Sequence, residues 1–332
     1  MTGAGLDRRH ALGIFAGAAA TSALPRAARA AAGARALRGV FPIAFTPVKA
    51  GNQVDYEGLA GQVKFLQRGG VQGVAWPQIA SGWTVLSEKE RMEGAEALTG
   101  AAKGGSTAVV IGVQSPDFAA VTRYAKQAEK LGADAIICIP PAGVSDEKAL
   151  LDYYQKVGKL THLPLFLQAV GNMSIDLVVK MVETIPTLRH VKDEAGQPLQ
   201  RIGELRRRTG DKLKVFSGNG VKTFITELER GTSGCCPYVS LADVYARAFD
   251  DWQAGKKQAA FNSFSAIMGA SAMFAQGNVN VLIARGVFKP GTRTRAAPPV
   301  PGAVAAGTYI PETTPEQIKR VLDTYMKPYL RA

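Results

Sequence analysis

The sequence predicts an α/β protein, a (β/α)8 TIM barrel with a C-terminal helical extension. From residue 40 onward, a short apolar strand, a turn and an amphipathic helix recur about every 25–30 residues. The expected strands alternate with helices, which favours a parallel sheet because parallel neighbours need crossover connections. They are apolar along their whole length, as in a sheet covered on both faces. An open doubly wound sheet would show a glycine-rich phosphate turn after its first strand, whereas here the first strand runs into Pro47 and a polar loop.

The elements follow in order along the chain. The expected strands are Val40–Thr46, Gly73–Pro77, Ala108–Val113, Ala135–Pro140, Pro164–Val170, His190–Glu194, Lys214–Ser217 and Gly234–Val239. The expected helices between them are Tyr56–Arg68, Ser87–Lys103, Asp117–Leu131, Asp146–Leu160, Ile175–Ile185, Leu199–Arg208 and Val221–Arg230. Further helices are expected at Leu241–Ala254, Lys256–Ala275 and Asn280–Gly286, then a proline-rich connection at Pro290–Pro311 and a last helix at Pro315–Tyr325. The barrel with its C-terminal helices therefore spans 39–286, and the connection with its terminal helix spans 287–332.

Residues 1–30 have the pattern of a twin-arginine-type signal peptide. Arg8 and Arg9 precede a weakly apolar run from Ile14 to Leu24, and Ala28-Arg29-Ala30 supplies small residues for cleavage. The alternative is an uncleaved membrane anchor, for which the apolar run is short. We therefore expect an exported, periplasmic protein with no stable membrane insertion after cleavage.

The composition and net charge of the chain limit the classes of molecule that it is expected to bind. The chain has 332 residues, 46% of them hydrophobic, and a formal net charge of +13. A basic balance is compatible with nucleic acid, anionic lipid or anionic small substrates. The basic residues are spread thinly, Arg206-Arg207-Arg208 is the one tight cluster, and no nucleic-acid motif accompanies it. We therefore expect a small anionic substrate and no nucleic acid.

The cysteines and histidines indicate neither a disulfide framework nor a metal site. Cys138, Cys235 and Cys236 lie in apolar strand-like segments, where buried free thiols are the expected state. The three histidines are isolated in the sequence, and neither a CxxC nor an HExxH motif is present. The sequence therefore predicts no metal and no cofactor.

The segment around Lys192 carries the most chemical information. Val191-Lys192-Asp193-Glu194 has the pattern of a short strand, yet it holds a lysine and two acids between apolar neighbouring strands. A lysine at a strand end usually extends its ammonium group to water. An enclosed lysine is different, because burial disfavours the charged form and the uncharged amine is a nucleophile that can form a Schiff base with a carbonyl.

Several further segments resemble one family. They are Gly39–Pro47, Val54–Leu59, Val85–Arg91, Val110–Val113, Ala128–Ala135, Ile139–Pro141, His190–Asp193 and Phe216–Gly220. In order and spacing over about residues 39–270, these segments resemble the dihydrodipicolinate synthase/N-acetylneuraminate lyase family of class I aldolase-like barrels. The resemblance implies a (β/α)8 barrel, a Schiff-base lysine on the sixth strand, which is Lys192 here, and a homo-oligomer.

The sequence departs from the family's pattern at several positions. In the carboxylate-binding turn after the second strand, Gln78-Ile79-Ala80-Ser81-Gly82 puts Ala80 where the family has threonine. Gln168 replaces the tyrosine that ends the fifth strand, and Ala142 or Gly143 the tyrosine after the fourth. Met173 replaces the arginine that holds a dicarboxylate in the synthases. The family's proton relay is therefore absent, and a role in lysine biosynthesis is not expected.

Glu194 is the expected replacement for that relay. Residues two apart in a strand point to the same side, so Glu194 shares the barrel interior with Lys192, with alpha carbons ~6–7 Å apart. It would serve as a general acid/base; the alternative is a salt-bridge partner that keeps Lys192 charged. Gln168 would orient a substrate hydroxyl or carbonyl, or else is a simple polar plug.

The remaining candidate contacts lie on two loops. Ala80 and Ser81 would bind the substrate carboxylate through backbone amides and the Ser81 hydroxyl, and Asn219 is either a ligand contact or a turn residue. These residues predict a Schiff-base-forming lyase, an aldolase or hydro-lyase acting on a 2-oxo acid or a sugar-derived oxo acid. The alternative is a catalytically inactive periplasmic binding protein for an oxo acid or sugar acid.

Overall fold

The structure is a computed structural model that describes residues 35–274, 277–295 and 313–332. The chain divides into two units, Met1–Ala34 and Arg35–Ala332. The expected signal peptide at 1–30 lies outside the described residues, so it stays a prediction. All the helices and strands of the described chain belong to the second unit.

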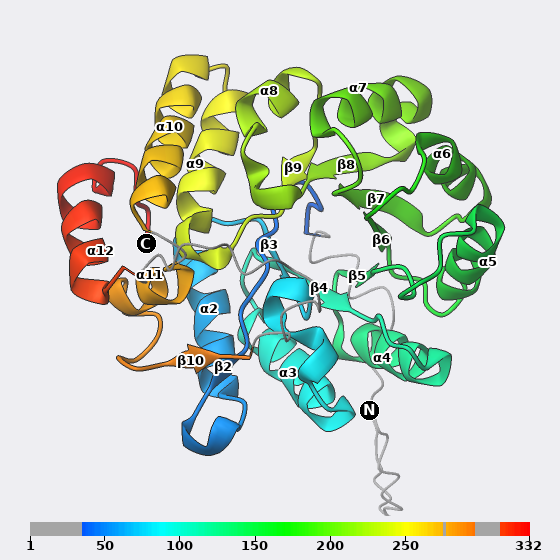
Figure 1. Ribbon diagram of the computed structural model, residues 1–332, viewed down its shortest axis with the longest axis horizontal. Helices are drawn as coiled ribbons and strands as arrows, with labels where there is room; N and C mark the ends of the chain where they lie inside the picture. Colours follow the sequence, from blue (N-terminus) through cyan, green and yellow to red (C-terminus); the bar gives the residue numbers. More distant parts are fainter. Residues whose placement is uncertain (1–34, 275–276, 296–312) are drawn as a thin grey trace, which may run out of the picture. The chain divides into compact units, whose positions relative to one another are not determined.

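Eight parallel strands form the central sheet, in the order β1-β9-β8-β7-β6-β5-β4-β3. They are β1 (Gly39–Val40), β3 (Gly73–Trp76), β4 (Ala108–Gly112), β5 (Ala135–Cys138), β6 (Leu165–Ala169), β7 (Leu188–Asp193), β8 (Lys214–Ser217) and β9 (Gly234–Cys235). The ring closes at Ile43, which forms parallel bridges with Ala75 and with Tyr238. Figure 1 shows the strands enclosed by helices. The predicted (β/α)8 barrel is confirmed.

Seven helices lie between the strands in the described chain, and the first five begin at a residue whose side chain caps the first turn. They are α2 (Tyr56–Arg68), α3 (Glu88–Ala101), α4 (Phe118–Leu131), α5 (Glu147–Val157), α6 (Ile175–Thr184), α7 (Pro198–Thr209) and α8 (Phe224–Glu229). Asp55, Asp117, Asp146 and Ser174 each accept a hydrogen bond from a first-turn amide. Ser87 and Glu90 form a reciprocal capping box at α3. Each helix lies within a few residues of its expected position.

The first and last barrel strands are shorter than expected. The strand expected at Val40–Thr46 is regular only over Gly39–Val40, and the one expected at Gly234–Val239 only over Gly234–Cys235. Each expected range contains a proline, Pro42 or Pro237, which has no N–H to donate to a sheet. Their carbonyls still accept hydrogen bonds, from Ala75 and Ile43 respectively. The barrel therefore stays together at this seam with fewer ladder bonds.

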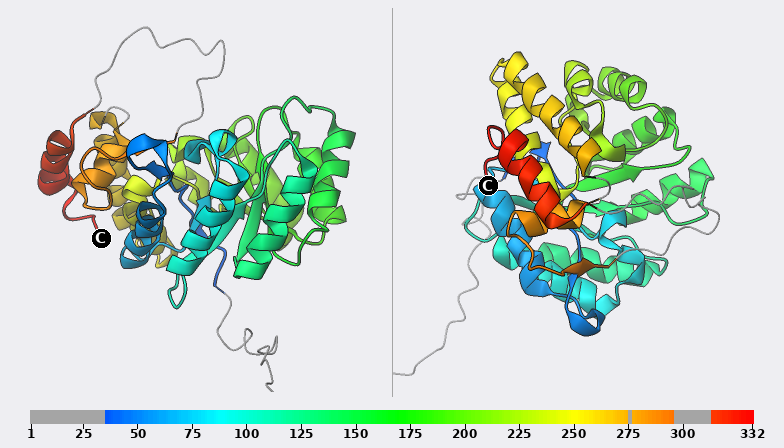
Figure 2. Two further views of the ribbon diagram at one scale, coloured as in Figure 1. Left: turned by 90° about the horizontal axis from the view of Figure 1, so that it is seen from below. Right: turned by 60° about the vertical axis from the view of Figure 1, so that its left-hand side comes forward.

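The C-terminal helices are present and cover one side of the barrel, as the sequence predicts. They are α9 (Ala242–Gln253), α10 (Lys257–Met273), α11 (Asn278–Ala284) and α12 (Pro315–Val321), which continues into a π-helical turn, η7 (Leu322–Met326). Figure 2 shows α12 packed beside α11. Within the described ranges, no single helix is long and apolar enough to cross a membrane, and only the pair α10 and α11, bent by 108°, passes that test together.

The start of the proline-rich connection holds a short strand that the sequence did not reveal. Strand β10 (Arg293–Thr294) pairs antiparallel with β2 (Pro47–Val48), which follows the first barrel strand. Two residues are too few to produce a periodic pattern. The rest of the expected connection, residues 296–312, lies outside the described residues.

Large apolar side chains fill the barrel interior below the carboxyl ends of the strands. Phe41 packs edge-on against Phe216, with ring centroids 5.4 Å apart, and Phe166 contacts both rings. His190 stacks on Phe166 at 4.2 Å. A TIM barrel is packed in this way rather than hollow, so open space for a ligand is confined to its rim.

Candidate active site at the carboxyl end of the barrel

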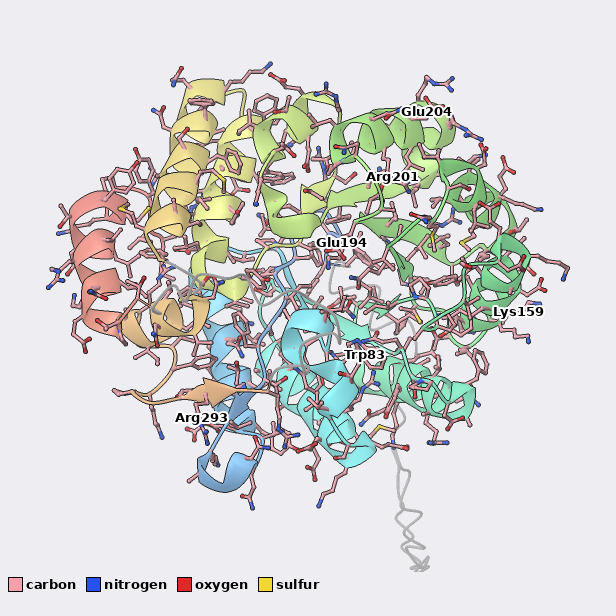
Figure 3. All side chains as sticks on the ribbon, in the orientation of Figure 1. Trp83, Lys159, Glu194, Arg201, Glu204 and Arg293 are labelled. Carbon is pink, nitrogen blue, oxygen red and sulfur yellow. The ribbon has the colours of Figure 1, made fainter. Side chains whose placement is uncertain are left out.

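A cavity of about 660 Å³ lies between the carboxyl ends of the strands and the C-terminal helices. The barrel contributes Ala80, Lys192, Glu194 and Cys236 to its lining, and the extension contributes residues of α9, α10 and α11. Figure 3 shows Glu194 near the centre of the ring, while Arg201 lies further out on α7. Barrel enzymes place their active sites at this end. The cavity is therefore the candidate active site.

Strand β7 places Lys192 in this cavity because its residues alternate between two sides. His190 stacks inside the barrel on Phe166, so Lys192 and Glu194 point inward as well. Asp193 points the other way and forms a buried ion pair with Arg201 of α7, with Arg201 Nε 2.9 Å from Asp193 Oδ2. This ion pair fixes the end of β7 against the helical layer. The alternation expected from the sequence is therefore observed.

Lys192 and Glu194 form an ion pair inside the cavity. Lys192 Nζ lies 3.0 Å from Glu194 Oε2, and the two side chains are 6% and 19% exposed. The Nε2 group of Gln168 donates a hydrogen bond to the same oxygen of Glu194. Gln168 is fully buried, and it is the register partner of Lys192 on the neighbouring strand β6. Three predicted site residues, Lys192, Glu194 and Gln168, are thus brought together.

Gly218, at the end of β8, determines where the Glu194 side chain lies. A Cβ atom at Gly218 would stand 2.3 Å from Glu194 Cγ and 2.9 Å from its Cδ and Oε1. The backbone of Gly218, at φ −120°, is not left-handed, and the close approach of Glu194 is a reason for the glycine that its φ does not supply. Sequence reasoning singled out the neighbouring Asn219 and passed over Gly218. No local pattern distinguishes a glycine needed for a distant carboxylate from one needed for a turn.

Ala80 and Ser81 lie on the 3-10 turn η2 (Ile79–Ser81) after β3. Ala80 lines the cavity. Ser81 is fully buried, and its hydroxyl donates to the carbonyl of Ala44 at 2.6 Å and accepts from the amide of Gln78 at 3.0 Å. The amides of Ser81 and Gly82 donate to carbonyls of the same turn. The structure therefore gives these groups partners within the fold, and their binding of a carboxylate stays a prediction.

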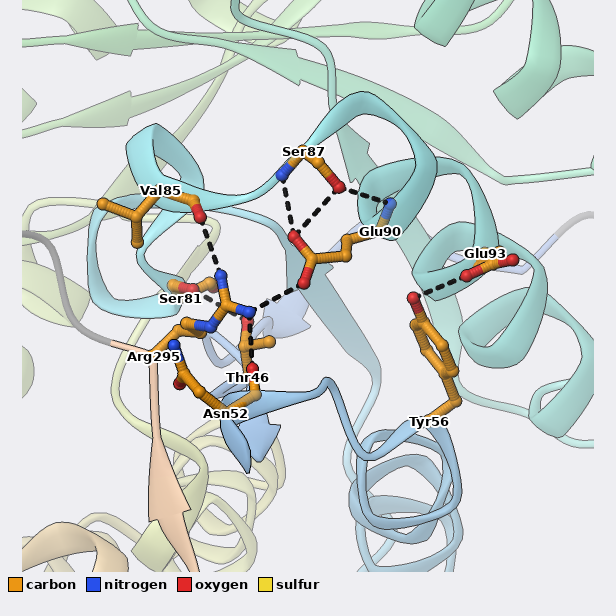
Figure 4. A network of polar contacts seen from close by, with 9 residues as sticks. All are labelled: Thr46, Asn52, Tyr56, Ser81, Val85, Ser87, Glu90, Glu93 and Arg295. Atoms are coloured by element: carbon orange, nitrogen blue, oxygen red, sulfur yellow. Dashed lines mark hydrogen bonds and ion pairs between the residues drawn. The ribbon is translucent and has the colours of Figure 1, made fainter. Parts of the chain in front are cut away.

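The turn that carries Ala80 is held by the C-terminal strand. Arg295, which follows β10, donates to the carbonyls of Val85 and Asn52 and pairs with Glu90 Oε1 at 2.7 Å (Figure 4). Thr46 donates to the carbonyl of Ser81 from the barrel side. A segment distant in sequence thus fixes one wall of the cavity.

The other predicted or substituted positions lie apart from the lysine. Asn219 begins the short turn η5 (Asn219–Val221) beside the cavity, but its side chain is outside the described part of the structure, so its role stays a prediction. Met173 is buried in the core, and its carbonyl accepts a hydrogen bond from Arg201. Ala142 and Gly143 are exposed in the loop after β5. Met173, Ala142 and Gly143 therefore supply no polar side-chain group.

Several residues of the cavity lining were not anticipated, among them Gln78, Lys222 and Tyr238. Gln78 is 1% exposed, and its Oε1 atom has no hydrogen-bond partner among the described residues. Tyr238 follows β9, stacks on Phe45 with ring centroids 5.7 Å apart, and is 46% exposed. Gln78 belongs to the turn that the sequence did highlight, so its polar side chain before Ala80 was the available signal. For Tyr238, the sequence offered no signal beyond its position in the last expected strand.

The cysteines are free and buried, as expected. Cys236 lines the cavity, and burial raises the pKa of its thiol to about 12, with a smaller opposing effect from Lys192. It is therefore protonated and a poor nucleophile at neutral pH. Within the described residues, no group of three or more His, Cys, Asp or Glu side chains could hold a metal ion.

Comparisons with known proteins agree with this architecture. Residues 36–287 match the Dihydrodipicolinate synthetase family. The chain belongs to this family. An uncharacterized DapA-like lyase of Thermococcus onnurineus is 28% identical over 172 residues, a match that covers 47% of this chain and only 58% of that protein. The 4-hydroxy-tetrahydrodipicolinate synthase of Methanothrix thermoacetophila is 28% identical over 217 residues, 64% of this chain and 71% of that one.

A solved structure shows the same fold. The N-acetylneuraminate lyase of Mycoplasma synoviae superimposes with a TM-score of 0.71 at 20% sequence identity, covering 88% of this chain and 98% of that one. At this identity the likeness concerns the fold alone. The family resemblance inferred from the sequence is confirmed.

Proposed function

We propose that the protein is a lyase that cleaves or dehydrates a 2-oxo acid through a Schiff base on Lys192. The observation that carries the proposal is the position of Lys192, an enclosed amine that lines the cavity 3.0 Å from a carboxylate. Relatives in the same family are named as lyases and synthases, and the superimposed neighbour is an N-acetylneuraminate lyase. These names support the reaction class, and the substrate remains to be found.

The chemistry follows from the two side chains. Transfer of a proton from Lys192 Nζ to Glu194 Oε2, one hydrogen bond away, gives an amine that can add to C2 of the 2-oxo acid. The proton returns from Glu194 to the carbinolamine hydroxyl, water leaves, and the iminium ion forms. With a 4-hydroxy substrate, Glu194 then accepts the hydroxyl proton, the C3–C4 electron pair moves to the iminium, and an aldehyde leaves. Reprotonation at C3 and hydrolysis of the imine release pyruvate and the free amine.

Dehydration uses the same intermediate. The Glu194 carboxylate takes a proton from C3 of the iminium ion to give an enamine, and it then gives that proton to the C4 hydroxyl group, which leaves as water. Hydrolysis of the resulting unsaturated iminium ion releases the product and the free amine. Gln168 holds Glu194 in place but cannot titrate, so it positions the proton carrier without carrying protons itself.

The ion pair also favours a second candidate function. A carboxylate beside an ammonium group stabilises the charged form, and a permanently charged Lys192 would bind an anionic oxo acid without reacting. The protein would then be a binding protein. Both functions require the same contact, so formation of a covalent adduct at Lys192 must separate them.

Borohydride trapping tests the proposal. Wild-type protein incubated with pyruvate and borohydride should gain the mass of a reduced pyruvyl adduct at Lys192. Lys192→Met should gain none, while Lys159→Met, at an exposed lysine on the periphery, should behave as the wild type. Failure to trap any 2-oxo acid at any pH would refute the lyase proposal and leave the binding protein.

Glu194→Gln tests the proton carrier separately. This variant should still give the trapped adduct but turn over ~10²-fold or more slowly, the usual contribution of a general acid/base. Normal turnover by Glu194→Gln would leave the lysine chemistry standing and remove Glu194 from it.

A further inference from the structure

The cavity is much larger than the space around Lys192 requires. Its volume of about 660 Å³ is within the roughly 300–1,000 Å³ typical of pockets for drug-sized ligands. A three-carbon acid such as pyruvate, bound at Lys192 on the barrel side, would leave most of it unfilled. The remaining volume lies toward the C-terminal helices and faces whatever group the substrate carries beyond its 2-oxo acid unit.

That distant part of the cavity is apolar. Leu241, Ile267, Met268 and Phe274 line it from the helical side. Ile267 and Phe274 are 1% and 5% exposed, so they form a fixed apolar wall in the packed core.

The mouth of the cavity is apolar as well. Ile79 and Tyr238 line it and are 55% and 46% exposed, which is unusual for large apolar side chains. Exposed apolar groups gathered at the rim of a pocket mark a surface that a ligand covers.

The polar side chains on the helical side are Ser240, Tyr245, Ser271 and Asn278, beside a larger apolar lining, and two of them bond to each other. Ser240 donates to Asn278 Oδ1 at 2.7 Å. Each hydroxyl of a polyhydroxylated chain buried here would need a partner or lose the free energy of its hydrogen bonds to water. A second carboxylate would need a cation, and besides Lys192 the described lining holds Lys222, which follows the turn η5 on the barrel side. Among the described lining residues from α9 to α11 there is no lysine or arginine.

We propose that the substrate carries an apolar group, aryl or branched alkyl, on the carbon chain beyond C3, and that this cavity wall is its binding subsite. The inference rests on the proposed function and narrows it: the aldehyde released by cleavage, or the alkene formed by dehydration, bears that group. A sugar-derived oxo acid is disfavoured, as is a dicarboxylic oxo acid whose second carboxylate points toward the C-terminal helices.

A matched series of acids tests the subsite without any imine. Calorimetry on Lys192→Met compares pyruvate with 4-phenyl-2-oxobutanoate and 2-oxoglutarate, which carry a phenyl group and a carboxylate respectively on C4. The phenyl acid should bind at least about ten-fold more tightly than pyruvate, the factor expected from burying an aromatic ring. Neither 2-oxoglutarate nor a 3-deoxy sugar 2-oxo acid should show this gain.

Two substitutions on α10 locate the effect. Ala272 lines the cavity, so Ala272→Trp in the same background should fill the subsite and bring the ratio of phenyl-acid to pyruvate affinity toward one. Phe261 is on the same helix, 53% exposed and away from the cavity, so Phe261→Trp should keep the ratio.

The outcomes separate this inference from the proposed function. Equal binding of pyruvate and the phenyl acid, or tighter binding of a polar acid, overturns the apolar subsite even if wild-type protein traps pyruvate. A phenyl preference in Lys192→Met, together with no borohydride adduct in the wild type, keeps the subsite and overturns the lyase. Retention of the preference in Ala272→Trp would also refute the assigned position.

Discussion

Gly218→Ala is the sharpest test of how the site works, because it moves Glu194 without changing its chemistry. The added methyl group would stand 2.3 Å from Glu194 Cγ, whereas ordinary van der Waals contact begins near 3.4 Å. Gly218 has a negative φ of −120°, so its backbone is not in the left-handed region that favours glycine. Relief of the clash must therefore come from the Glu194 side chain.

The size of the effect follows from that displacement. The side chain must withdraw by about 1 Å, the difference between 3.4 Å and 2.3 Å. We expect this shift to lengthen the 3.0 Å contact between Nζ and Oε2 beyond hydrogen-bonding range. A misplacement of about 1 Å costs on the order of 10²-fold in rate. We expect kcat/KM to fall by about that factor while the protein remains folded.

The assay measures turnover of whichever 2-oxo acid borohydride trapping identifies, together with the melting temperature. Gly203→Ala is the matched control: a Cβ there meets nothing within 4 Å, and alanine in a helix is favoured over glycine by about 1 kcal/mol. It should keep activity and gain slightly in stability. If Gly218→Ala turned over normally while a structure of the variant showed Glu194 displaced, Glu194 would not be the proton carrier.

Three further predictions concern the frame of the site and export. Arg201→Met should lower the free energy of unfolding by about 3–5 kcal/mol at neutral pH, because it leaves the Asp193 carboxylate buried without its partner. Burial raises the pKa of Asp193, so this loss, measured by urea unfolding, should become smaller as the pH falls and the carboxyl group takes up a proton. Burial lowers the pKa of His190 to about 3, so the wild type should lose up to about 1.4 kcal/mol per pH unit between roughly pH 6.5 and 3, where only the unfolded chain binds the proton; His190→Phe should remove that slope. An Arg8→Lys/Arg9→Lys form should fail to reach the periplasm, and undiminished export in cell fractionation would contradict the twin-arginine prediction.

The order of strands and helices could be predicted from the sequence because each barrel unit repeats one local pattern. Strand β8 and helix α2 match their expected bounds. The strand is followed by the turn residues Gly218 and Gly220, and the amphipathic helix is preceded by its cap, Asp55. The seam at β1 and β9 was harder, since Pro42 and Pro237 shorten strands whose composition still favours the sheet. Strand β10 could not be found, because two residues carry no period and its partner lies far away in sequence.

In the candidate site, too, local features could be predicted from the sequence and contacts between distant segments could not. Lys192 and Glu194 follow from the two-residue period of one strand, and that local inference agrees with the structure. The contacts of Gly218 with Glu194 and of Ser81 with Ala44 join different strands and loops. Their distances depend on the closure of the whole ring, which no single segment encodes. The apolar wall at Ile267 depends on how α10 docks, and its helical pattern alone would have assigned it to ordinary core.

The ion pair between Lys192 and Glu194 is compatible with both a reactive and an unreactive lysine. The apolar subsite suggests how a bound substrate could favour the reactive state. In a wet cavity the charged pair is hydrated. A substrate with an apolar group displaces water from the mouth at Ile79 and Tyr238 and lowers the polarity around the pair. Because two buried charges cost more free energy than two neutral groups, that step shifts the proton from Nζ toward Oε2. The lysine would then become nucleophilic when the correct substrate is bound, so the rate of trapping at saturation should be higher for the phenyl acid than for pyruvate; equal saturated rates would show that the substrate's apolar group contributes to binding alone.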